Sequence, residues 1–177
     1  LDEDFDHDAA VRDVLYAAFG YSGQKCSACS RAIVDTAVYD EFIERLIERT
    51  KKMKIGSTKD PDTYIGPVIN MAAMAKILDY IDMGKREGKL VLGGNRAGNK
   101  GFFIEPTIIV DVDRKATIAQ EEIFGPVLTV IRAQDFRDAL DIANDSEYGL
   151  TGSLYTQNRE KMRQAADEFH VGNLYFN

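Results

Sequence analysis

Two hydrophobic patterns alternate along this chain, and their alternation constrains the fold more than any other feature. Short β-branched runs, such as 127–132, predict buried strands. Longer stretches with apolar residues three and four positions apart, such as 39–53, predict amphipathic helices. We expect strands at 31–38, 89–92, 102–112, 127–132, 152–156 and 171–176, and helices at 6–19, 39–53, 136–143 and 159–169, with one more from Asn70 to its end at Gly84 and Gly88.

Strands that alternate with helices are typical of a parallel or mixed sheet with helices on both faces. The predicted fold class is therefore α/β: a three-layer helix–sheet–helix domain with a mostly parallel sheet. Pro106 interrupts one predicted strand, which suggests an edge strand or a bulge.

The charge balance excludes some kinds of partner. The chain has 22 basic and 29 acidic residues, a net charge of −7. This acidity argues against nucleic acid or an anionic membrane as a partner, and no apolar run approaches the roughly 20 residues of a membrane span.

Two cysteines make no disulfide framework, so we expect a reducing compartment, the cytoplasm or, in a eukaryote, the mitochondrial matrix.

Residues 19–31 (FGYSGQKCSACSR) gather glycines, thiols and cations more densely than any other segment. Glycine lets the backbone approach a ligand closely. Both thiols, Cys26 and Cys29, lie here, and Lys25 and Arg31 flank them. Cations and backbone N–H groups favour the thiolate, which is the nucleophilic form. The segment thus indicates a nucleophile on a rigid turn.

Three interpretations of Cys26 and Cys29 stay open on the residues alone. Both can be small core residues, since free cysteine is often buried. Both can form a redox or zinc pair, although zinc needs two more ligands and the two histidines, His7 and His170, are far apart. In the third interpretation Cys26 is a catalytic nucleophile and Cys29 packs beside it.

A second group, residues 121–126 (EEIFGP), directly precedes the strand predicted from Val127. Its plainest interpretation is a hydrated acidic loop, because exposed carboxylates are usually just solvated.

Both segments resemble motifs of the aldehyde dehydrogenase superfamily. The pattern F-x-x-x-G-Q-x-C at 19–26 is similar to its active-site signature, and 121–126 contains its Glu-x-Phe-Gly-Pro motif. The string GQKCSACSR at 23–31 resembles the branch that oxidises glutamate semialdehyde, the 1-pyrroline-5-carboxylate dehydrogenases. Weaker similarities extend over nearly the whole chain, at 66–68, 103–107, 144, 148–150 and 172–173.

The resemblance implies oxidation of an aldehyde to a carboxylate with NAD, or with NADP. It implies that Cys26 is the nucleophile, which forms a thiohemiacetal and then a thioester. Glu122 is expected to accept hydrogen bonds from the nicotinamide ribose, and Phe124 to pack beside the nicotinamide. A carboxylate suits a diol, and an aromatic wall excludes water. Lys25 and Ser27, beside Cys26, are expected at the polar end of the substrate.

The resemblance also implies that residues 1–177 are the cysteine-bearing catalytic domain of a longer, homo-oligomeric protein. In that family the dinucleotide-binding half and the general base precede the cysteine, and the oligomerisation tail lies further on. We therefore expect no useful activity from this chain alone, and no metal site. The alternatives are an aldehyde dehydrogenase with another aldehyde, a non-enzymatic module that kept the fold, and a redox protein with a reversible Cys26–Cys29 disulfide.

Overall fold

The computed structural model describes residues 1–2 and 6–177. The helices are α1 (His7–Phe19), α2 (Tyr39–Thr50), α3 (Met71–Glu87), α4 (Thr117–Gln120), α5 (Phe136–Asn144) and α6 (Arg159–Glu168), with a 3-10 turn η1 (Gly20–Gly23). The strands are β1 (Arg31–Asp35), β2 (Lys89–Leu92), β3 (Thr107–Val110), β4 (Val127–Ala133), β5 (Thr151–Leu154) and β6 (Asn173–Phe176).

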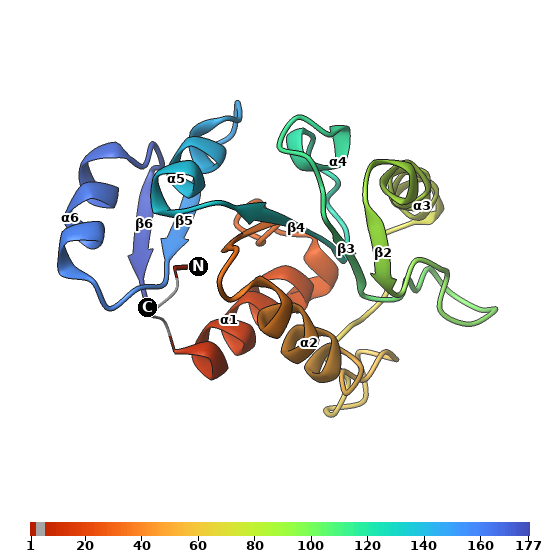
Figure 1. Cartoon of the computed structure of the whole chain (residues 1–177). Helices are drawn as coiled ribbons and strands as arrows, with labels where there is room; N and C mark the ends of the chain where they lie inside the picture. The colour runs from red at the N-terminus through yellow and green to blue at the C-terminus, as the bar shows by residue number, and fades with distance from the viewer. Residues whose placement is uncertain (3–5) are drawn as a thin grey trace.

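Four strands form the main sheet, in the order β1-β4-β3-β2. Strands β1, β4 and β3 run parallel, and β2 runs antiparallel to β3 (Figure 1). The other two strands, β5 and β6, form a separate parallel pair. The predicted α/β class with a mostly parallel sheet is confirmed, although the strands divide into two sheets.

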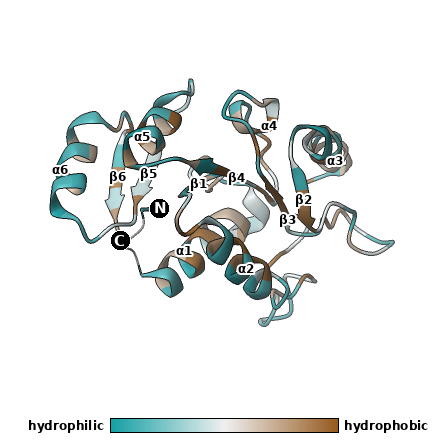
Figure 2. Ribbon diagram, in the orientation of Figure 1, coloured by the Kyte–Doolittle hydropathy of each residue, from teal (hydrophilic) through white to brown (hydrophobic). Residues whose placement is uncertain are grey.

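Helices cover both faces of the main sheet because its central strand is apolar on both sides. In β4, Leu128 and Val130 belong to the core shared with α1 and α2. Their neighbours Val127 and Ile131 belong to the core shared with α3 and α5. Figure 1 shows α1 and α2 on one side and α3, α4 and α5 on the other, and Figure 2 shows hydrophobic β3 and β4 between them. The predicted three layers are present.

Helix α3 begins where the sequence predicts and ends later than Gly84 suggests. The Asn70 side chain accepts a hydrogen bond from the Ala73 N–H, as an N-cap does. Gly84 is buried inside the helix, where a Cβ would lie 2.4 Å from the side chain of Ile109. The expectation that it ends the helix is wrong, because this glycine serves close helix–sheet packing. Gly88 is the C-cap.

The expected strand 102–112 is shorter than predicted. Pro106 directly precedes β3, so its missing N–H costs no ladder bond. Of the two expected alternatives, the edge strand is wrong, since β3 lies between β4 and β2. The β2–β3 pair does contain a register shift, but it lies in β2, between Leu90 and Leu92. The one-turn helix α4 was not predicted, because four residues are too few for a helical period to be visible. Among residues 1–2 and 6–177, no helix is long and apolar enough to cross a membrane.

Candidate active site

Helix α1 delivers the first half of the site, residues 20–30, which we call the cysteine turn. The helix ends at the fully buried Phe19, and Gly20 is its C-cap. The next three residues, Tyr21, Ser22 and Gly23, all have positive φ, at 58°, 57° and 68°. The chain then turns again before β1, with the Cys29 N–H donating back to the carbonyl of Ala17 in α1.

Helix α3 supports the second half, residues 121–126, which we call the glutamate loop. Lys76 donates to the carbonyl of Glu122 at 3.1 Å. The hydroxyl of Tyr80 donates to the carboxylate of Glu121 at 2.5 Å, and this hydrogen bond raises the pKa of Tyr80. No role for Lys76 and Tyr80 was predicted from the sequence. The only signal in the sequence is their spacing of four residues, which places them on the same face of a helix.

The two halves meet because β1 and β4 are parallel neighbours, so the segments that precede them reach the same edge of the sheet. Both the N–H and the hydroxyl of Thr129 donate to the carbonyl of Ser30. A Cβ on Gly23 would lie only 2.0 Å from the carbonyl oxygen of Gly125. The cysteine turn and the glutamate loop therefore touch backbone to backbone.

This site lies at the amino ends of parallel strands. Ligands of open α/β sheets usually bind at the carboxyl ends. A reversed edge strand does not explain the difference, since the reversed strand is β2, at the far side of the sheet from β1.

All five site residues expected from the sequence line one cleft of about 820 Å³: Lys25, Cys26, Ser27, Glu122 and Phe124. Glu122 is exposed, and the ring of Phe124 is 42% exposed. A carboxylate, an aromatic ring and the thiol of Cys26 therefore line the same cleft. Lys25 leans back toward α1, since a Cβ on Gly20 would lie 3.4 Å from its ammonium.

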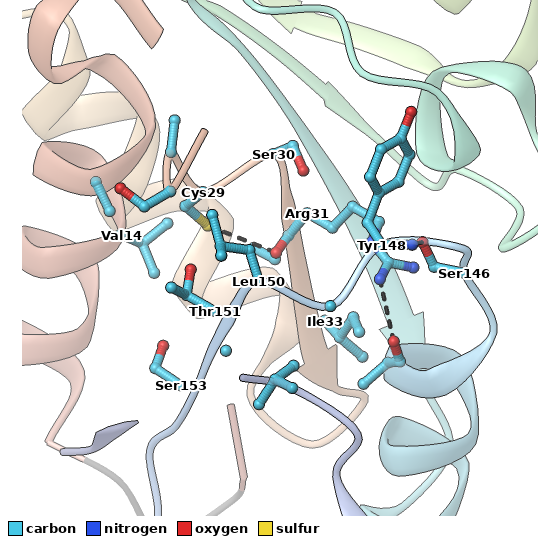
Figure 3. A pocket seen from close by; sticks show the side chains of 18 of the residues that line it. Val14, Cys29, Ser30, Arg31, Ile33, Ser146, Tyr148, Leu150, Thr151 and Ser153 are labelled. Carbon is cyan, nitrogen blue, oxygen red and sulfur yellow. Dashed lines mark hydrogen bonds between the residues drawn. The ribbon is translucent and has the colours of Figure 1, made fainter. Parts of the chain in front are cut away.

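The two thiols differ in their surroundings. Cys26 is exposed at the cleft, whereas Cys29 is partly buried against the α1–α2 core, and both are free. Cys29 donates weakly to the carbonyl of Arg31 at 3.5 Å (Figure 3). Burial raises the pKa of the Cys29 thiol to about 11, so Cys29 stays protonated at neutral pH. Both thiols line the cleft, and Cys26 is the more exposed of the two.

Arg31 links the cysteine turn to a third wall of the cleft. Its guanidinium donates to the carbonyls of Ile142 and Ala143, at the end of α5. Burial lowers the pKa of this guanidinium. The chain after α5 then places Tyr148, 58% exposed, over the cleft (Figure 3). In sequence Tyr148 was only a weak part of the resemblance.

No group of three or more metal-ligating side chains occurs within the described residues.

The sequence of this chain is similar to those of known proteins. The sequence model described as "Aldehyde dehydrogenase family" matches residues 1–177. The 1-pyrroline-5-carboxylate dehydrogenase of Bacillus subtilis is 54% identical over 177 residues, which are all of this chain and 34% of that protein.

Solved structures resemble the fold closely. A 1-pyrroline-5-carboxylate dehydrogenase from Thermus with bound NAD has a TM-score of 0.96 at 49% identity, over 99% of this chain and 34% of the other. A betaine aldehyde dehydrogenase from Staphylococcus aureus in complex with NAD+ has a TM-score of 0.94 at 38% identity, over 98% of this chain and 36% of the other. The chain thus spans about a third of the length of these relatives, and it belongs to the aldehyde dehydrogenase family.

Proposed function

We propose that the protein containing this chain oxidises glutamate semialdehyde, the open form of 1-pyrroline-5-carboxylate, to glutamate with NAD. The observation that carries the proposal is that Cys26, Glu122 and Phe124 line the same cleft. The relatives from Bacillus and Thermus, named for this substrate, support the choice of aldehyde. Residues 1–177 are then the cysteine-bearing catalytic domain, and the cytoplasm is the proposed location.

The residues of the cleft fit a nicotinamide cofactor. The exposed carboxylate of Glu122 can accept hydrogen bonds from both hydroxyls of a ribose, and the exposed ring of Phe124 offers a flat apolar wall for a nicotinamide. When bound, NAD supplies a hydride acceptor. Glu122 then fixes the ribose, while Phe124 excludes water from the reacting carbon. NADP fits these two residues equally well.

Cys26 opens the reaction as a nucleophile. Its thiolate attacks the aldehyde carbon and gives a thiohemiacetal, whose oxygen carries the negative charge. Loss of hydride from the former aldehyde carbon leaves a thioester on Cys26. Water cleaves that thioester, which releases the carboxylate and restores the thiol. The balance is one aldehyde, one NAD and one water consumed for each carboxylate, one NADH and two protons released.

The backbone N–H of Cys26 is the proposed donor to the oxyanion. Within residues 1–2 and 6–177 it has no hydrogen-bond acceptor, so it can serve this purpose. A donor fixed by the backbone stabilises developing charge without reorganisation. Lys25 and Ser27 are proposed for the polar end of the substrate, and unchanged substrate affinity in Lys25→Met and Ser27→Ala would remove them from this role.

The test uses the full-length protein, because the cofactor-binding half, the general base and the homo-oligomer contacts are proposed to lie outside these residues. NADH formation is followed with glutamate semialdehyde and with a panel of simple aldehydes. We expect preference for the semialdehyde, and a loss on the order of 10⁴-fold in kcat for Cys26→Ala, since the nucleophile itself is removed.

Cys29→Ala is the matched control, since it removes the other thiol of the same turn. Turnover of other aldehydes only would discard the branch and keep the family chemistry. Turnover that survives Cys26→Ala would discard the nucleophile. Stable binding partners without any aldehyde turnover would favour a non-enzymatic module, and a Cys26–Cys29 disulfide that forms and breaks reversibly would favour a redox protein.

A further inference from the structure

The turn before Cys26 contains backbone strain that needs a cause. Tyr21 and Ser22 adopt left-handed conformations, with (φ, ψ) of (58°, 27°) and (57°, 32°). A non-glycine residue in this region is strained, because its Cβ lies close to the following carbonyl oxygen. Such conformations persist only where surrounding contacts over-determine them, and they gather at functional sites. Specific contacts must therefore hold this turn in place.

The side chain of Gln24 supplies two of these contacts. Its oxygen accepts a hydrogen bond from the Ile69 N–H at 2.9 Å. Its nitrogen donates to the carbonyl of Tyr21 at 3.3 Å, the same carbonyl that accepts from the backbone N–H of Gln24 at 3.2 Å. One amide group thus joins the left-handed turn to a segment 45 residues further along the chain.

Ser22 makes a second tie to the same segment. It is only 2% exposed, and its hydroxyl donates to the carbonyl of Gly66 at 2.9 Å. Residues 66–69 are therefore joined to the cysteine turn at both ends, through Ser22 and through Gln24. The Gln24 contact is the easier of the two to test by substitution, because Gln24 is partly exposed and its own backbone is not left-handed.

The segment 66–69 leads directly into α3, whose N-cap is Asn70. Two turns further on, Lys76 holds the carbonyl of Glu122, and Ile77 packs where a Cβ on Gly125 would lie, at 2.6 Å. A continuous path of contacts thus runs from the cysteine turn through 66–69 and α3 to the glutamate loop.

We infer that Gln24 is a positioning residue, which fixes the Cys26 thiol relative to Glu122 by bracing the left-handed turn 21–23 against Ile69. Its effect on turnover rests on the proposed function, whereas the brace itself does not. Gln24 acts through the backbone of the turn. Because kcat depends on the placement of the thiol, loss of Gln24 should lower kcat and change the KM for NAD much less.

The test compares three variants of the full-length protein. Gln24→Met removes both hydrogen bonds of the amide at similar volume. Gln24→Glu keeps the oxygen that accepts from Ile69. Gln134→Met makes the same chemical change at an exposed glutamine between β4 and α5. Hydrogen exchange of peptides 19–30 and 64–70, kcat and the KM for NAD are measured for each.

We expect exchange in both peptides to rise about tenfold in Gln24→Met, and kcat to fall about tenfold with the KM for NAD within about twofold. In Gln24→Glu, most of the protection from exchange and most of the wild-type kcat should remain. Gln134→Met should match the wild type. Unchanged exchange in Gln24→Met, or a kcat within twofold of the wild type, would overturn the inference. It would also be overturned if Gln24→Glu lost as much kcat and as much protection from exchange as Gln24→Met. Were the wild type to oxidise no aldehyde, the proposed function would fall, and exchange alone would decide whether Gln24 braces the turn.

Discussion

The cysteine turn and the glutamate loop have the same place in the topology, since each leads into the amino end of a parallel strand, yet they are held in different ways. The cysteine turn contains three left-handed residues and is held from inside, by the hydrogen bond from the buried Ser22 to Gly66. The glutamate loop is fixed from outside, by the exposed bonds of Lys76 and Tyr80. The proposed nucleophile, Cys26, needs a fixed position, whereas the carboxylate proposed to bind the cofactor, Glu122, must stay accessible.

Apart from loss of the proposed nucleophile itself, the largest effect should come from breaking the contact between the two regions. In Gly23→Ala, the new Cβ would lie 2.0 Å from the carbonyl oxygen of Gly125, and alanine would also be forced to a φ of 68°. We expect the turn to shift, with kcat/KM for the aldehyde lower by about 100-fold, since a displacement near 1 Å at a reacting group has that effect. Steady-state kinetics of the full-length protein measure it.

Gly98→Ala is the control for backbone conformation alone. Gly98 has a similar φ of 73°, but a Cβ there would meet nothing within 4 Å. Its replacement should cost about 1–2 kcal/mol of stability, seen as a lower Tm, with kcat/KM unchanged. Equal kinetic losses in the two variants would mean that the Gly23–Gly125 contact has no special importance.

The sequence predicts what depends on local periodicity and fails where tertiary contacts decide. β4 and α3 are visible because a strand buried on both faces and a long capped helix leave clear patterns. Nothing in a Tyr-Ser pair predicts left-handed backbone, because the contacts of residues 66–69 impose it. A glycine such as Gly84 locally indicates a helix end. Only the contact with Ile109 shows that this glycine allows α3 to pack closely on the sheet.

The candidate site divides in the same way. Cys26 and Glu122 are candidates because their short motifs resemble those of a known family, whereas residues 121–126 alone would be interpreted as a hydrated acidic loop. Their meeting follows from the pairing of β1 with β4, which strand patterns cannot specify. Lys76 and Tyr80 carry no motif, and their contacts with the glutamate loop follow from the packing of α3.

A smaller effect, confined to the glutamate loop, should follow from Glu122→Gln. The amide keeps an acceptor oxygen but loses the charge that strengthens bonds to the ribose hydroxyls. We expect the KM for NAD to rise about tenfold, equivalent to about 1.4 kcal/mol, with a smaller change in kcat. Initial rates at varied NAD concentration measure both.

Glu121→Gln is the matched control, because Glu121 is the neighbouring carboxylate and is held by Tyr80. Glutamine can still accept from that hydroxyl, so the KM for NAD should stay within about twofold. A tenfold rise in Glu121→Gln with no rise in Glu122→Gln would exchange the roles of the two carboxylates.

Within the cysteine turn, the smallest effect on turnover should come from Cys29→Ala, although it changes the same turn as Cys26→Ala. Cys29 is partly buried against the core, and its thiol donates only a weak hydrogen bond. We expect kcat within about threefold of the wild type, with a stability loss of about 1 kcal/mol from the lost sulfur contacts. A loss as large as that of Cys26→Ala would show that the second thiol takes part in the chemistry.

Alkylation by iodoacetamide separates the two thiols without any turnover. Because the pKa of Cys29 is raised to about 11, its thiolate fraction is negligible at neutral pH and grows only as the pH rises toward that value. Mass spectrometry of the native protein should therefore find label on Cys26 at pH values near 7, and on Cys29 only in strongly alkaline solution. Labelling of Cys29 at the rate of Cys26 near neutrality would contradict its burial. It would also remove the contrast between an exposed thiol and a thiol that is partly buried against the core.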